Sequence, residues 1–266
     1  MRIEELENAD IDLLRQLQPE TWTDIRPYFY FYSASDFCQP LKISENGQII
    51  AVGTNIQHRD SAWLAHIIVH PEHRNKGLGR EIASALINSL DSQRFKTIYL
   101  DATEMGYPVY KKLGFETETE YTHLTGVHTD QYLSDPAAIV PFKNQQKDEL
   151  LALDRKISAE DRINVLEPHL RYSLVYIVEG HVEGAYFPSL LDGFVLANTP
   201  IAGTELMKIR MRSKATARFP SENQACIDFL VKNGYEVTGA SKRMVLGQKR
   251  DWNGKGIFHR ISGGLG

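Results

Sequence analysis

A glycine-containing turn between a strand-like run and an amphipathic helix constrains the fold most. Residues 69–80 read VHPEHRNKGLGR, and apolar residues then recur every four positions, which predicts a helix beginning at about Lys76 or Gly77 and ending near Asp91. Gly77 and Gly79 expose backbone NH groups without intrahelical partners at the positive end of the helix dipole. The turn therefore predicts a site for a phosphate or pyrophosphate; the alternative is that the glycines only shape a tight turn. The basic side chains of Arg74, Lys76 and Arg80 surround this turn.

The order of elements around this turn predicts a mixed α/β sheet. The first thirty-odd residues have helical spacing interrupted by Pro19 and Pro27, and the pair Asn46-Gly47 marks a β-hairpin. Strand and helix patterns then alternate along the chain. The expected elements are strands at 41–44, 48–57 and 61–69, the helix after the glycine turn, a strand at 96–102, a short helix at 107–113 and a strand region at 115–126.

A second series of elements predicts a second domain. Residues 129–144 contain two prolines and no clear period, so we place a linker there, between domains at 1–128 and 145–266. The sequence CIDFLVKNGYEVTG, residues 226–239, aligns with YPVYKKLGFETE, residues 107–118, when the glycines are matched, which indicates an internal repeat. The expected elements of the second half are helices at 147–153, 203–212 and 222–232, and strands at 172–178, 194–197, 214–219 and 242–246.

Composition excludes several classes of protein. Apolar residues make up 42% and charged residues 24% of the 266 residues, so each half can bury a core. A formal net charge of −4 without a Lys/Arg-rich run argues against a nucleic-acid partner. Acidic residues interrupt the N-terminal sequence MRIEELENADIDLL, which therefore lacks the apolar region of a signal peptide. No apolar run reaches the length of a membrane span, so no membrane partner is expected.

Cysteine and histidine positions give two further expectations. The two cysteines, Cys38 and Cys226, lie far apart in the sequence, which is typical of a protein of the reducing cytoplasm rather than of a disulfide framework. His70 and His73 have no third ligand at a suitable spacing, so no metal site is predicted.

Two motifs resemble those of a known family. Residues 69–80 resemble motif A of the GNAT superfamily of acyl-CoA-dependent N-acyltransferases, V-x-P-x-x-R-x-x-G-(I/L)-G, with every defined position filled. Residues 107–115, YPVYKKLGF, resemble motif B of the family, which has an aromatic residue, two polar residues, Leu, Gly and Phe. The resemblance covers residues 1–128 and implies a GNAT fold, whose mixed sheet splays between the strands at 61–69 and 96–102, with acetyl-CoA as the co-substrate.

The resemblance also implies which residues contact coenzyme A. In the GNAT family the pantetheine arm lies in the splay like an extra strand, and the pyrophosphate binds the glycine turn. Thr103 stands where the family often has an asparagine, so a polar contact to the cofactor is expected there. The remaining contacts are expected at Ile67, Ile68, Val69, Arg74, Asn75, Lys76, Gly77, Leu78, Gly79 and Arg80.

Tyr110 occupies the position of the family's phenolic general acid. Acetyl transfer to an amine expels a thiolate, and a phenol with an ordinary pKa of about 10 can protonate that thiolate as it leaves. The resemblance therefore assigns catalysis to Tyr110. The alternative is that Tyr110 only packs its ring beside the helix.

The catalytic base is not fixed in the family, and the sequence leaves it open. His66 lies on the strand before the glycine turn. Strand alternation puts His66 on the face opposite Trp63 and Ala65, which hold the places where family members tend to carry a base. We therefore interpret His66 as a structural residue, or as one that acts through another residue of the site. The alternatives are Asp101, Glu104 and a chain of water molecules.

The acceptor, an amine of a small molecule or a peptide, is expected to approach from the N-terminal helices, which shape the acceptor pocket in the GNAT family. Trp22, Asp24, Phe29 and Tyr30 are the candidate lining residues, with Asp24 supplying charge for an ammonium group. The alternative is that the aromatic residues belong to the core.

The second half lacks the residues that carry the chemistry. Leu230 aligns with Tyr110, and no R-x-x-G-x-G precedes the helix near Gly203. The plan and the ending GIFHRISGGLG resemble a bacterial tandem GNAT group with a degenerate C-terminal GNAT-like domain. We predict an N-acetyltransferase with an active domain at 1–128 and a degenerate GNAT-like domain at 145–266 that covers or shapes the acceptor site. The alternatives are a non-catalytic coenzyme A-binding sensor or interaction module, and a transferase with a longer acyl donor.

Overall fold

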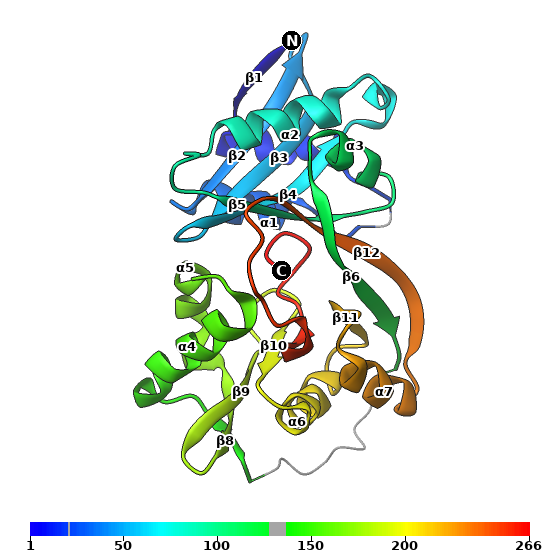
Figure 1. The fold of residues 1–266 in the computed structure, drawn as a ribbon. Helices are drawn as coiled ribbons and strands as arrows, with labels where there is room; N and C mark the ends of the chain where they lie inside the picture. The colour runs from blue at the N-terminus through cyan, green and yellow to red at the C-terminus, as the bar shows by residue number, and fades with distance from the viewer. Residues whose placement is uncertain (21, 128–136) are drawn as a thin grey trace. The chain divides into compact units, whose positions relative to one another are not determined.

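The computed structural model (Figure 1) describes residues 1–20, 22–127 and 137–266. Residues 129–136 of the expected linker lie outside this described part. The described chain divides into two compact units. The first unit comprises Met1–Glu116, Met244–Lys249 and Leu265, and the second comprises Thr117–Arg243, Arg250–Gly264 and Gly266.

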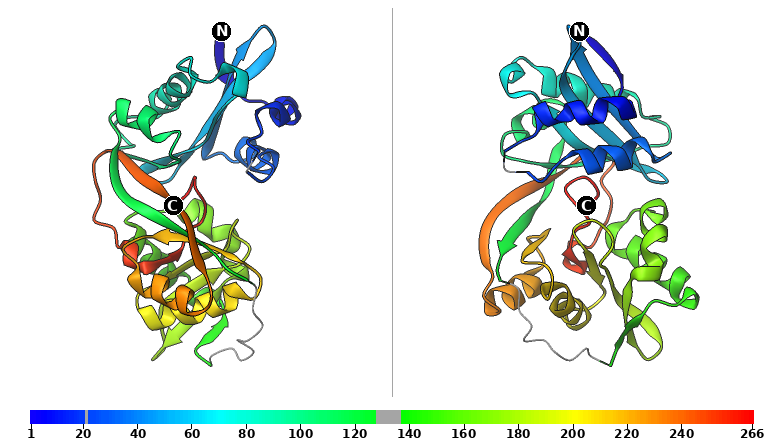
Figure 2. Two further views of the ribbon diagram at one scale, coloured as in Figure 1. Left: turned by 90° about the vertical axis from the view of Figure 1, so that its right-hand side faces the viewer. Right: turned by 180° about the vertical axis from the view of Figure 1, so that it is seen from behind.

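The first unit is a mixed sheet with helices on both faces. The sheet has the order β1-β2-β3-β4-β5-β12, and Figure 2 shows α2 on one face and the helices of residues 8–33 on the other. Strands β3 and β4 have the bounds expected from the sequence, whereas β1 was not expected. The elements are β1 (Arg2–Glu5), the 3-10 helix η1 (Asn8–Leu17), α1 (Arg26–Ser33), β2 (Cys38–Glu45), β3 (Gln48–Gln57), β4 (Ser61–Val69), η2 (Pro71–His73), α2 (Leu78–Asn88), β5 (Thr97–Ala102), α3 (Tyr107–Lys112) and the end of β12 (Glu236–Gly247).

The regular apolar spacing of α2 explains its position. Leu78, Ile82 and Leu86 form one stripe of the helix and are buried in the core of the first unit, as expected for an amphipathic helix packed on a sheet. They pack with side chains of β3, β4 and β5 such as Ile50 and Leu100. The core therefore fixes α2, and with it the glycine turn, against the end of β4.

The sheet opens between β4 and β5. Their parallel pairing runs from Ser61 and Thr97 to Leu64 and Leu100, although β4 continues to Val69. The mixed sheet and its splay, which the GNAT resemblance implied, are thus confirmed.

A β-bulge lies on the other edge of the same stretch of β4. Val52 pairs with Ile68 and Thr54 pairs with Ala65, so two residues of β4 lie opposite the single residue Gly53. A Cβ atom at Gly53 would lie 2.9 Å from a side-chain carbon of Leu86, which explains the glycine there. One bulge residue, His66, has a left-handed backbone with a φ of 48°. Simple alternation along β4 therefore ends at His66.

The C-terminal part of β12 completes the sheet of the first unit. Gln248 N donates to Lys96 O at 2.8 Å, and Thr97 Oγ1 donates to Gln248 O at 2.7 Å. Gly247 has a φ of 88°, and a Cβ atom there would lie 2.3 Å from Lys96 O. The compact units are therefore not the contiguous stretches 1–128 and 145–266 expected from the sequence, because strand β6 falls largely in the second unit and the end of β12 falls in the first.

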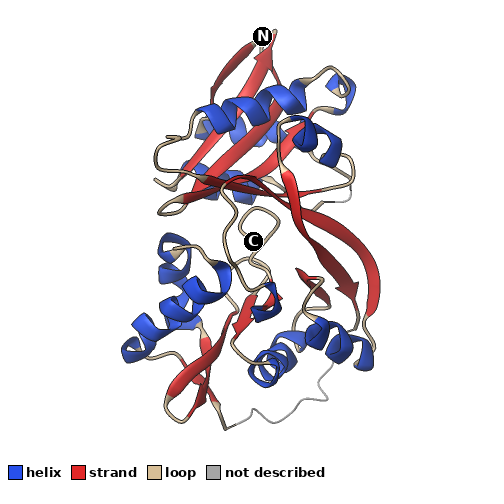
Figure 3. Ribbon diagram, in the orientation of Figure 1, coloured by secondary structure: helices blue, strands red, loops and turns tan. Residues whose placement is uncertain are grey.

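The second unit contains a five-stranded antiparallel sheet of order β13-β10-β9-β8-β7 (Figure 3). Strand β9 was not expected from the sequence, and β7 forms within the expected linker. The elements are β6 (Glu116–Thr125), β7 (Ile139–Pro141), η3 (Asn144–Gln146), α4 (Lys147–Ser158), α5 (Ile163–Leu166), η4 (Glu167–Tyr172), β8 (Leu174–Val178), β9 (His181–Phe187), β10 (Phe194–Ala197), α6 (Pro200–Met211), β11 (Thr216–Pro220), α7 (Gln224–Lys232), η5 (Gly254–Gly256) and β13 (Ile257–His259).

The internal repeat is visible in the backbone geometry. Gly114 and Gly234 both end a helix with a left-handed φ, 92° and 82°. Phe115 N donates to Tyr110 O at 3.0 Å, and Tyr235 N donates to Leu230 O at the same distance. The two segments that the sequence aligned thus make the same hydrogen bond at matched positions.

Among the described residues, none of the helices combines the length and the hydropathy that a bilayer-spanning segment needs.

Candidate functional site

The glycine turn exposes the first backbone amides of α2. Gly77 is the N-cap residue with a left-handed φ of 88° and makes no side-chain cap hydrogen bond. The first amides bonded within the helix are those of Arg80 and Glu81, which donate to Gly77 O at 3.0 Å. The amides of Leu78 and Gly79 precede this ladder and are available to an anion.

Gly79 has room for a side chain within the protein itself. A Cβ atom at this position would meet only a methyl carbon of Val69, at 3.7 Å, which is an ordinary van der Waals contact. Gly inside a helix destabilises it by roughly 0.5–1 kcal/mol relative to Ala. The fold therefore does not require glycine here, whereas the close approach of a ligand to the backbone would.

The basic side chains of the turn divide into two kinds. Arg74 Nε donates to Val69 O at 3.3 Å, so part of its guanidinium group ties the turn to the end of β4. Lys76 and Arg80 are exposed, as is Asn75, whose φ of 61° is left-handed. Lys76 and Arg80 are thus solvent-exposed beside the first amides of α2, while Arg74 keeps the turn in place.

The end of β4 offers backbone groups on its β5-facing edge. Ile68 and Val69 pair with Val52 and Ala51 of β3, but the pairing with β5 has already ended at Leu64. The backbone of Ile67, Ile68 and Val69 therefore lines the opening of the sheet.

Thr103 follows β5 and bonds the turn that leads into α3. Its Oγ1 accepts a hydrogen bond from Gly106 N at 3.3 Å, and its carbonyl oxygen accepts one from Tyr107 N at 2.9 Å. The hydroxyl proton of Thr103 is not used in this turn, so the exposed side chain can still donate a hydrogen bond.

Tyr110 is 9% exposed and packs against Phe115, with ring centroids 6.0 Å apart. A Cβ atom at Gly106 would lie 2.8 Å from the Tyr110 ring, so Gly106 makes room for it. Burial, reinforced by the negative charge of Asp101, raises the pKa of Tyr110 above its ordinary value. Within the described part of the chain, its hydroxyl group has no hydrogen-bond partner. The phenol therefore stays protonated at neutral pH and is available as a proton donor.

The four expected acceptor-site residues have different environments. Phe29 has no exposed surface and thus belongs to the core, whereas Trp22 and Tyr30 are 41% and 47% exposed. The carboxylate of Asp24 forms an ion pair with Arg26, with Oδ2 and Nη2 2.6 Å apart. The hydrogen bonds from Arg26 lower the pKa of Asp24 to about 2. The charge of Asp24 is therefore already compensated within the protein.

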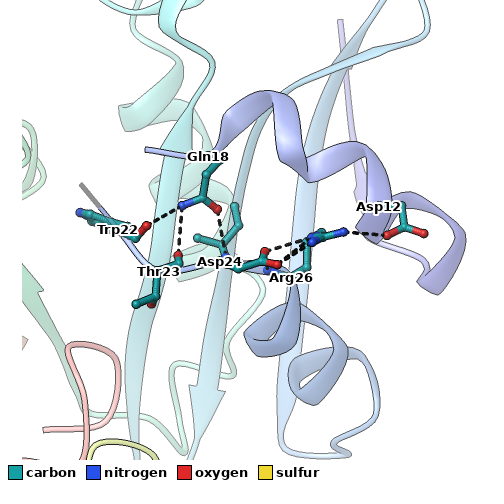
Figure 4. Close-up of polar contacts among 7 residues, drawn as sticks. Asp12, Gln18, Trp22, Thr23, Asp24 and Arg26 are labelled. Carbon is teal, nitrogen blue, oxygen red and sulfur yellow. Dashed lines mark hydrogen bonds and ion pairs between the residues drawn. The ribbon is translucent and has the colours of Figure 1, made fainter. Parts of the chain in front are cut away.

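A glutamine that the sequence did not single out organises the segment before α1 (Figure 4). Gln18 Nε2 donates to the carbonyl oxygens of Pro19, Trp22 and Thr23 at 3.0–3.1 Å. Its Oε1 accepts a hydrogen bond from Ile25 N at 3.0 Å. A single amide side chain thus holds both ends of the segment that carries Trp22. Only the folded loop brings these backbone groups together, so no sequence signal marks Gln18.

We expect Gln18→Ala to loosen this segment without unfolding the first unit. The substitution removes the acceptor of the Ile25 amide, and each such hydrogen bond contributes about 1 kcal/mol. Hydrogen exchange at Ile25 should accelerate by about fivefold, while exchange in β3 stays unchanged. Gln16→Ala is the matched control, because Gln16 lies in the last turn of η1, which Gln18 follows directly, but donates to Ile49 O. Equal exchange at Ile25 in both variants would contradict the role of Gln18.

His66 is surrounded by aromatic side chains from the N-terminal segment. Its ring centroid lies 4.7 Å from that of Tyr28 and 5.9 Å from that of Trp22, and its Nδ1 lies 2.8 Å from Tyr32 Oη. The rings of Phe29 and Tyr32 complete what we call the His66 cluster: His66, Trp22, Tyr28, Phe29 and Tyr32. The sequence made His66 a candidate only because of its position on β4. It did not predict the aromatic cluster, because the cluster depends on the bulge.

The other candidates for a base lie elsewhere in the first unit. Asp101 is partly buried on β5 and acts electrostatically on Tyr110, whereas Glu104 is exposed in the turn before α3. His70 Nδ1 accepts a hydrogen bond from Glu72 N at 3.3 Å. Across the described residues, no group of three or more His, Cys, Asp or Glu side chains is arranged to hold a metal ion.

Comparison with known proteins gives a family match within the first unit. Residues 4–115 match the model of the Acetyltransferase (GNAT) family. The Uncharacterized N-acetyltransferase YitH of Bacillus subtilis is 24% identical over 213 residues, which is 75% of this chain and 75% of that protein.

Two solved structures are similar over nearly the whole chain. A candidate acetyltransferase from Pyrococcus horikoshii has a TM-score of 0.85 at 18% identity. The match covers 100% of this chain and 95% of that protein's chain. A tandem GNAT protein from the clavulanic acid biosynthesis pathway has a TM-score of 0.58 at 12% identity, covering 94% and 99%. At these identities the two structures show a shared fold.

Proposed function

We propose, from the match of residues 4–115 to the acetyltransferase (GNAT) family, that the chain transfers an acetyl group from acetyl-CoA to the amine of a small molecule or peptide. The observation that carries the proposal is the environment of Gly79. This glycine has space for a side chain in the protein alone, yet it lies among unbonded amides and basic residues at the start of α2. A phosphate-bearing ligand accounts for that combination.

The residues of the first unit fit coenzyme A. The amides of Leu78 and Gly79 would bind its pyrophosphate, with Lys76 and Arg80 adding positive charge. The backbone of Ile67 to Val69 would bind its pantetheine arm in the opening of the sheet, and Thr103 would donate a hydrogen bond. Bound there, acetyl-CoA supplies an acyl group activated as a thioester.

Direct transfer requires no enzyme nucleophile. Cys38 is largely buried, and burial raises the pKa of its thiol to about 12, so it carries little thiolate at neutral pH. A backbone amide near Ile67 stabilises the negative charge that develops on the carbonyl oxygen. Tyr110 donates its proton to the departing sulfur.

The second unit is suited to structure rather than to coenzyme A binding. Thr199 is the N-cap residue of α6, and its Oγ1 accepts a hydrogen bond from Ala202 N at 3.3 Å. Pro200 follows in the first turn. A Cβ atom at Gly203 would lie 2.2 Å from the Phe258 ring, so this glycine serves packing. Leu230, which matches Tyr110 in the repeat, is fully buried.

A screen of amines tests the proposed function. The protein is incubated with acetyl-CoA and, separately, with an N-terminal alanine peptide, an Nα-blocked lysine peptide, an aromatic monoamine and a polyamine. Release of free coenzyme A thiol above the amine-free rate, with the acetylated product seen by mass spectrometry, is the expected result for at least one class. Binding of acetyl-CoA without turnover of any amine would instead support the non-catalytic sensor or interaction module.

One coenzyme A is expected per chain. The amides at the start of α2 are open, whereas Thr199 caps the start of α6. Calorimetric titration with acetyl-CoA should therefore give a stoichiometry near one, and Thr199→Gly should leave it unchanged. A stoichiometry near two would contradict the assignment of the second unit as degenerate.

A further inference from the structure

His66 lies where the sheet of the first unit opens. The pairing of β4 with β5 ends at Leu64, two residues before it, and the bulge opposite Gly53 includes it. Its φ of 48° is in the left-handed region, which residues with a side chain seldom adopt. Residues with such a backbone cluster at functional sites. The bulge turns the imidazole toward Trp22, Tyr28 and the other aromatic residues of the His66 cluster, rather than along the simple alternation of the strand.

One ring nitrogen of His66 is held and the other is not. Nδ1 lies 2.8 Å from Tyr32 Oη, and among the residues that the structure describes Nε2 has no hydrogen-bond partner. When Nδ1 carries the hydrogen and donates it to Tyr32, Nε2 presents a lone pair. Tyr32 Oη can accept that hydrogen, and in this arrangement His66 is an acceptor at Nε2.

The surroundings of His66 are electrically neutral. Burial alone lowers the pKa of His66 to about 4, and no charged side chain contributes to the shift. The titratable groups that face it are Tyr28 and Tyr32 of α1, and burial raises the pKa of Tyr32 well above its ordinary value. The carboxylate of Asp24 is paired with Arg26. A protonated amine would thus meet neither a free carboxylate nor a strong base in the described part of the cluster.

We propose that Nε2 of His66 accepts a hydrogen bond from the uncharged acceptor amine, and that the His66 cluster thereby selects weakly basic primary amines, such as the α-amino group of a peptide. The proposal rests on the proposed function and deepens it. At pH 7.5 about a quarter of an α-amino group with a pKa near 8 is uncharged, against about one in a thousand lysine side chains. Since His66 cannot deprotonate an alkylammonium ion, the abundance of the neutral amine decides the rate.

The proton balance of the transfer is complete with two residues. As the amine nitrogen bonds to the carbonyl carbon, it becomes far more acidic and passes one proton to Nε2 of His66. The carbon–sulfur bond then breaks, and the sulfur takes a proton from Tyr110. Exchange with solvent returns a proton to Tyr110 and removes one from His66. His66 and Tyr110 touch the reacting atoms, whereas Tyr32 acts through His66 and is a positioning residue.

A pair of acceptors tests the selectivity. We compare Ala-Gly-Gly amide, which has only an α-amine, with Nα-acetyl-Lys-Gly-Gly amide, which has only a lysine side-chain amine. The expected result at pH 7.5 is a kcat/KM about 10²-fold higher for the α-amine, falling toward equality as the pH rises through 10 and the lysine amine loses its proton. A polyamine or lysine peptide acetylated faster at pH 7.5 would overturn the proposed selectivity.

Substitution of His66 tests its contact with the amine. His66→Gly suits the left-handed backbone and leaves space for added imidazole. We expect turnover of the best acceptor to fall by about 10²-fold and to recover saturably with imidazole, in proportion to its neutral form. His66→Asn also tolerates the backbone and can still bond Tyr32, but it lacks an atom in place of Nε2, so it should be equally slow. Tyr32→Phe should lower kcat about tenfold and should not respond to imidazole.

Controls distinguish a direct contact between His66 and the amine from a purely structural role of His66. His181→Asn, at an exposed histidine of the second unit, should behave as wild type, and calorimetry should show unchanged acetyl-CoA affinity in every variant. Normal turnover of His66→Asn would overturn the inference. A loss in both His66 variants that imidazole does not restore would also overturn it, and would assign His66 to holding the bulge. Failure of the wild type with every amine would contradict the proposed function itself.

Discussion

Tyr110→Phe is expected to lower turnover by about 10²- to 10⁴-fold while leaving acetyl-CoA affinity nearly unchanged. The substitution keeps the ring that packs on Phe115 and removes only the hydroxyl group. Because burial raises the pKa of Tyr110 above its ordinary value, the phenol is protonated at neutral pH, and the substitution removes a proton donor there. The measurement is steady-state turnover with the acceptor found in the amine screen, together with calorimetric titration of acetyl-CoA.

Tyr107→Phe is the matched control for this prediction. Tyr107 lies on the same short helix and is only partly buried, and we assign it no role in proton transfer. Turnover of Tyr107→Phe should stay close to that of the wild type. Near-normal turnover of Tyr110→Phe would leave Tyr110 as a packing residue, and would require another donor for the departing sulfur.

Gly79→Leu is expected to weaken acetyl-CoA binding by at least about 10²-fold. A side chain at this position covers the amides of Leu78 and Gly79, and hydrogen bonds to charged groups contribute about 1.5–3 kcal/mol each. Loss of two such bonds corresponds to a factor of 10² or more in affinity. Calorimetric titration of the purified variant measures the effect directly.

Gly79→Ala distinguishes the effect of a side chain on the stability of the fold from its effect on ligand binding. A Cβ atom fits at this position, so the free protein should become about 0.5–1 kcal/mol more stable in urea unfolding even as its affinity for acetyl-CoA falls. Asn88→Leu, at the exposed far end of α2, should leave the affinity unchanged. Undiminished affinity in Gly79→Leu would exclude the glycine turn as the pyrophosphate site.

Local signals in the sequence predicted the elements on which the candidate site is built. The apolar spacing of Leu78, Ile82 and Leu86 placed α2, and the Asn46-Gly47 pair placed the turn before β3; Gly47 has the expected left-handed φ of 80°. Such signals lie within a few neighbouring residues, because helix periodicity and turn chemistry are local requirements of the backbone. The repeat was visible for the same reason, since Gly114 and Gly234 each end a helix.

The pairing of distant strands was not visible in the sequence. Thr97 bonds Gln248, which is separated from it by 151 positions, and no local pattern states which strand will lie beside β5. The sequence suggested contiguous domains because elements near each other in the chain usually pair. Strand β9, which begins at His181, was missed because its glycine and polar residues obscure the alternation.

The environment of the charged and aromatic residues also depended on tertiary structure. Asp24 was expected to supply charge for an ammonium group, but the folded segment places Arg26 against it. His66 was assigned by strand alternation, which the bulge interrupts. Neither outcome follows from residue type, because both depend on backbone geometry set by other strands and loops.

The sequence by itself determined the glycine turn, the helix that follows it, the position of Tyr110 and the loss of its counterpart at Leu230. These features depend on residue type and on spacings of a few residues, which the chain carries locally. Only the tertiary structure decided that the end of β12 completes the sheet of the first unit and that His66 faces Tyr32. Strand pairing and bulges form when segments distant in the sequence bury their apolar faces against one another. No single stretch of the sequence therefore predicts them.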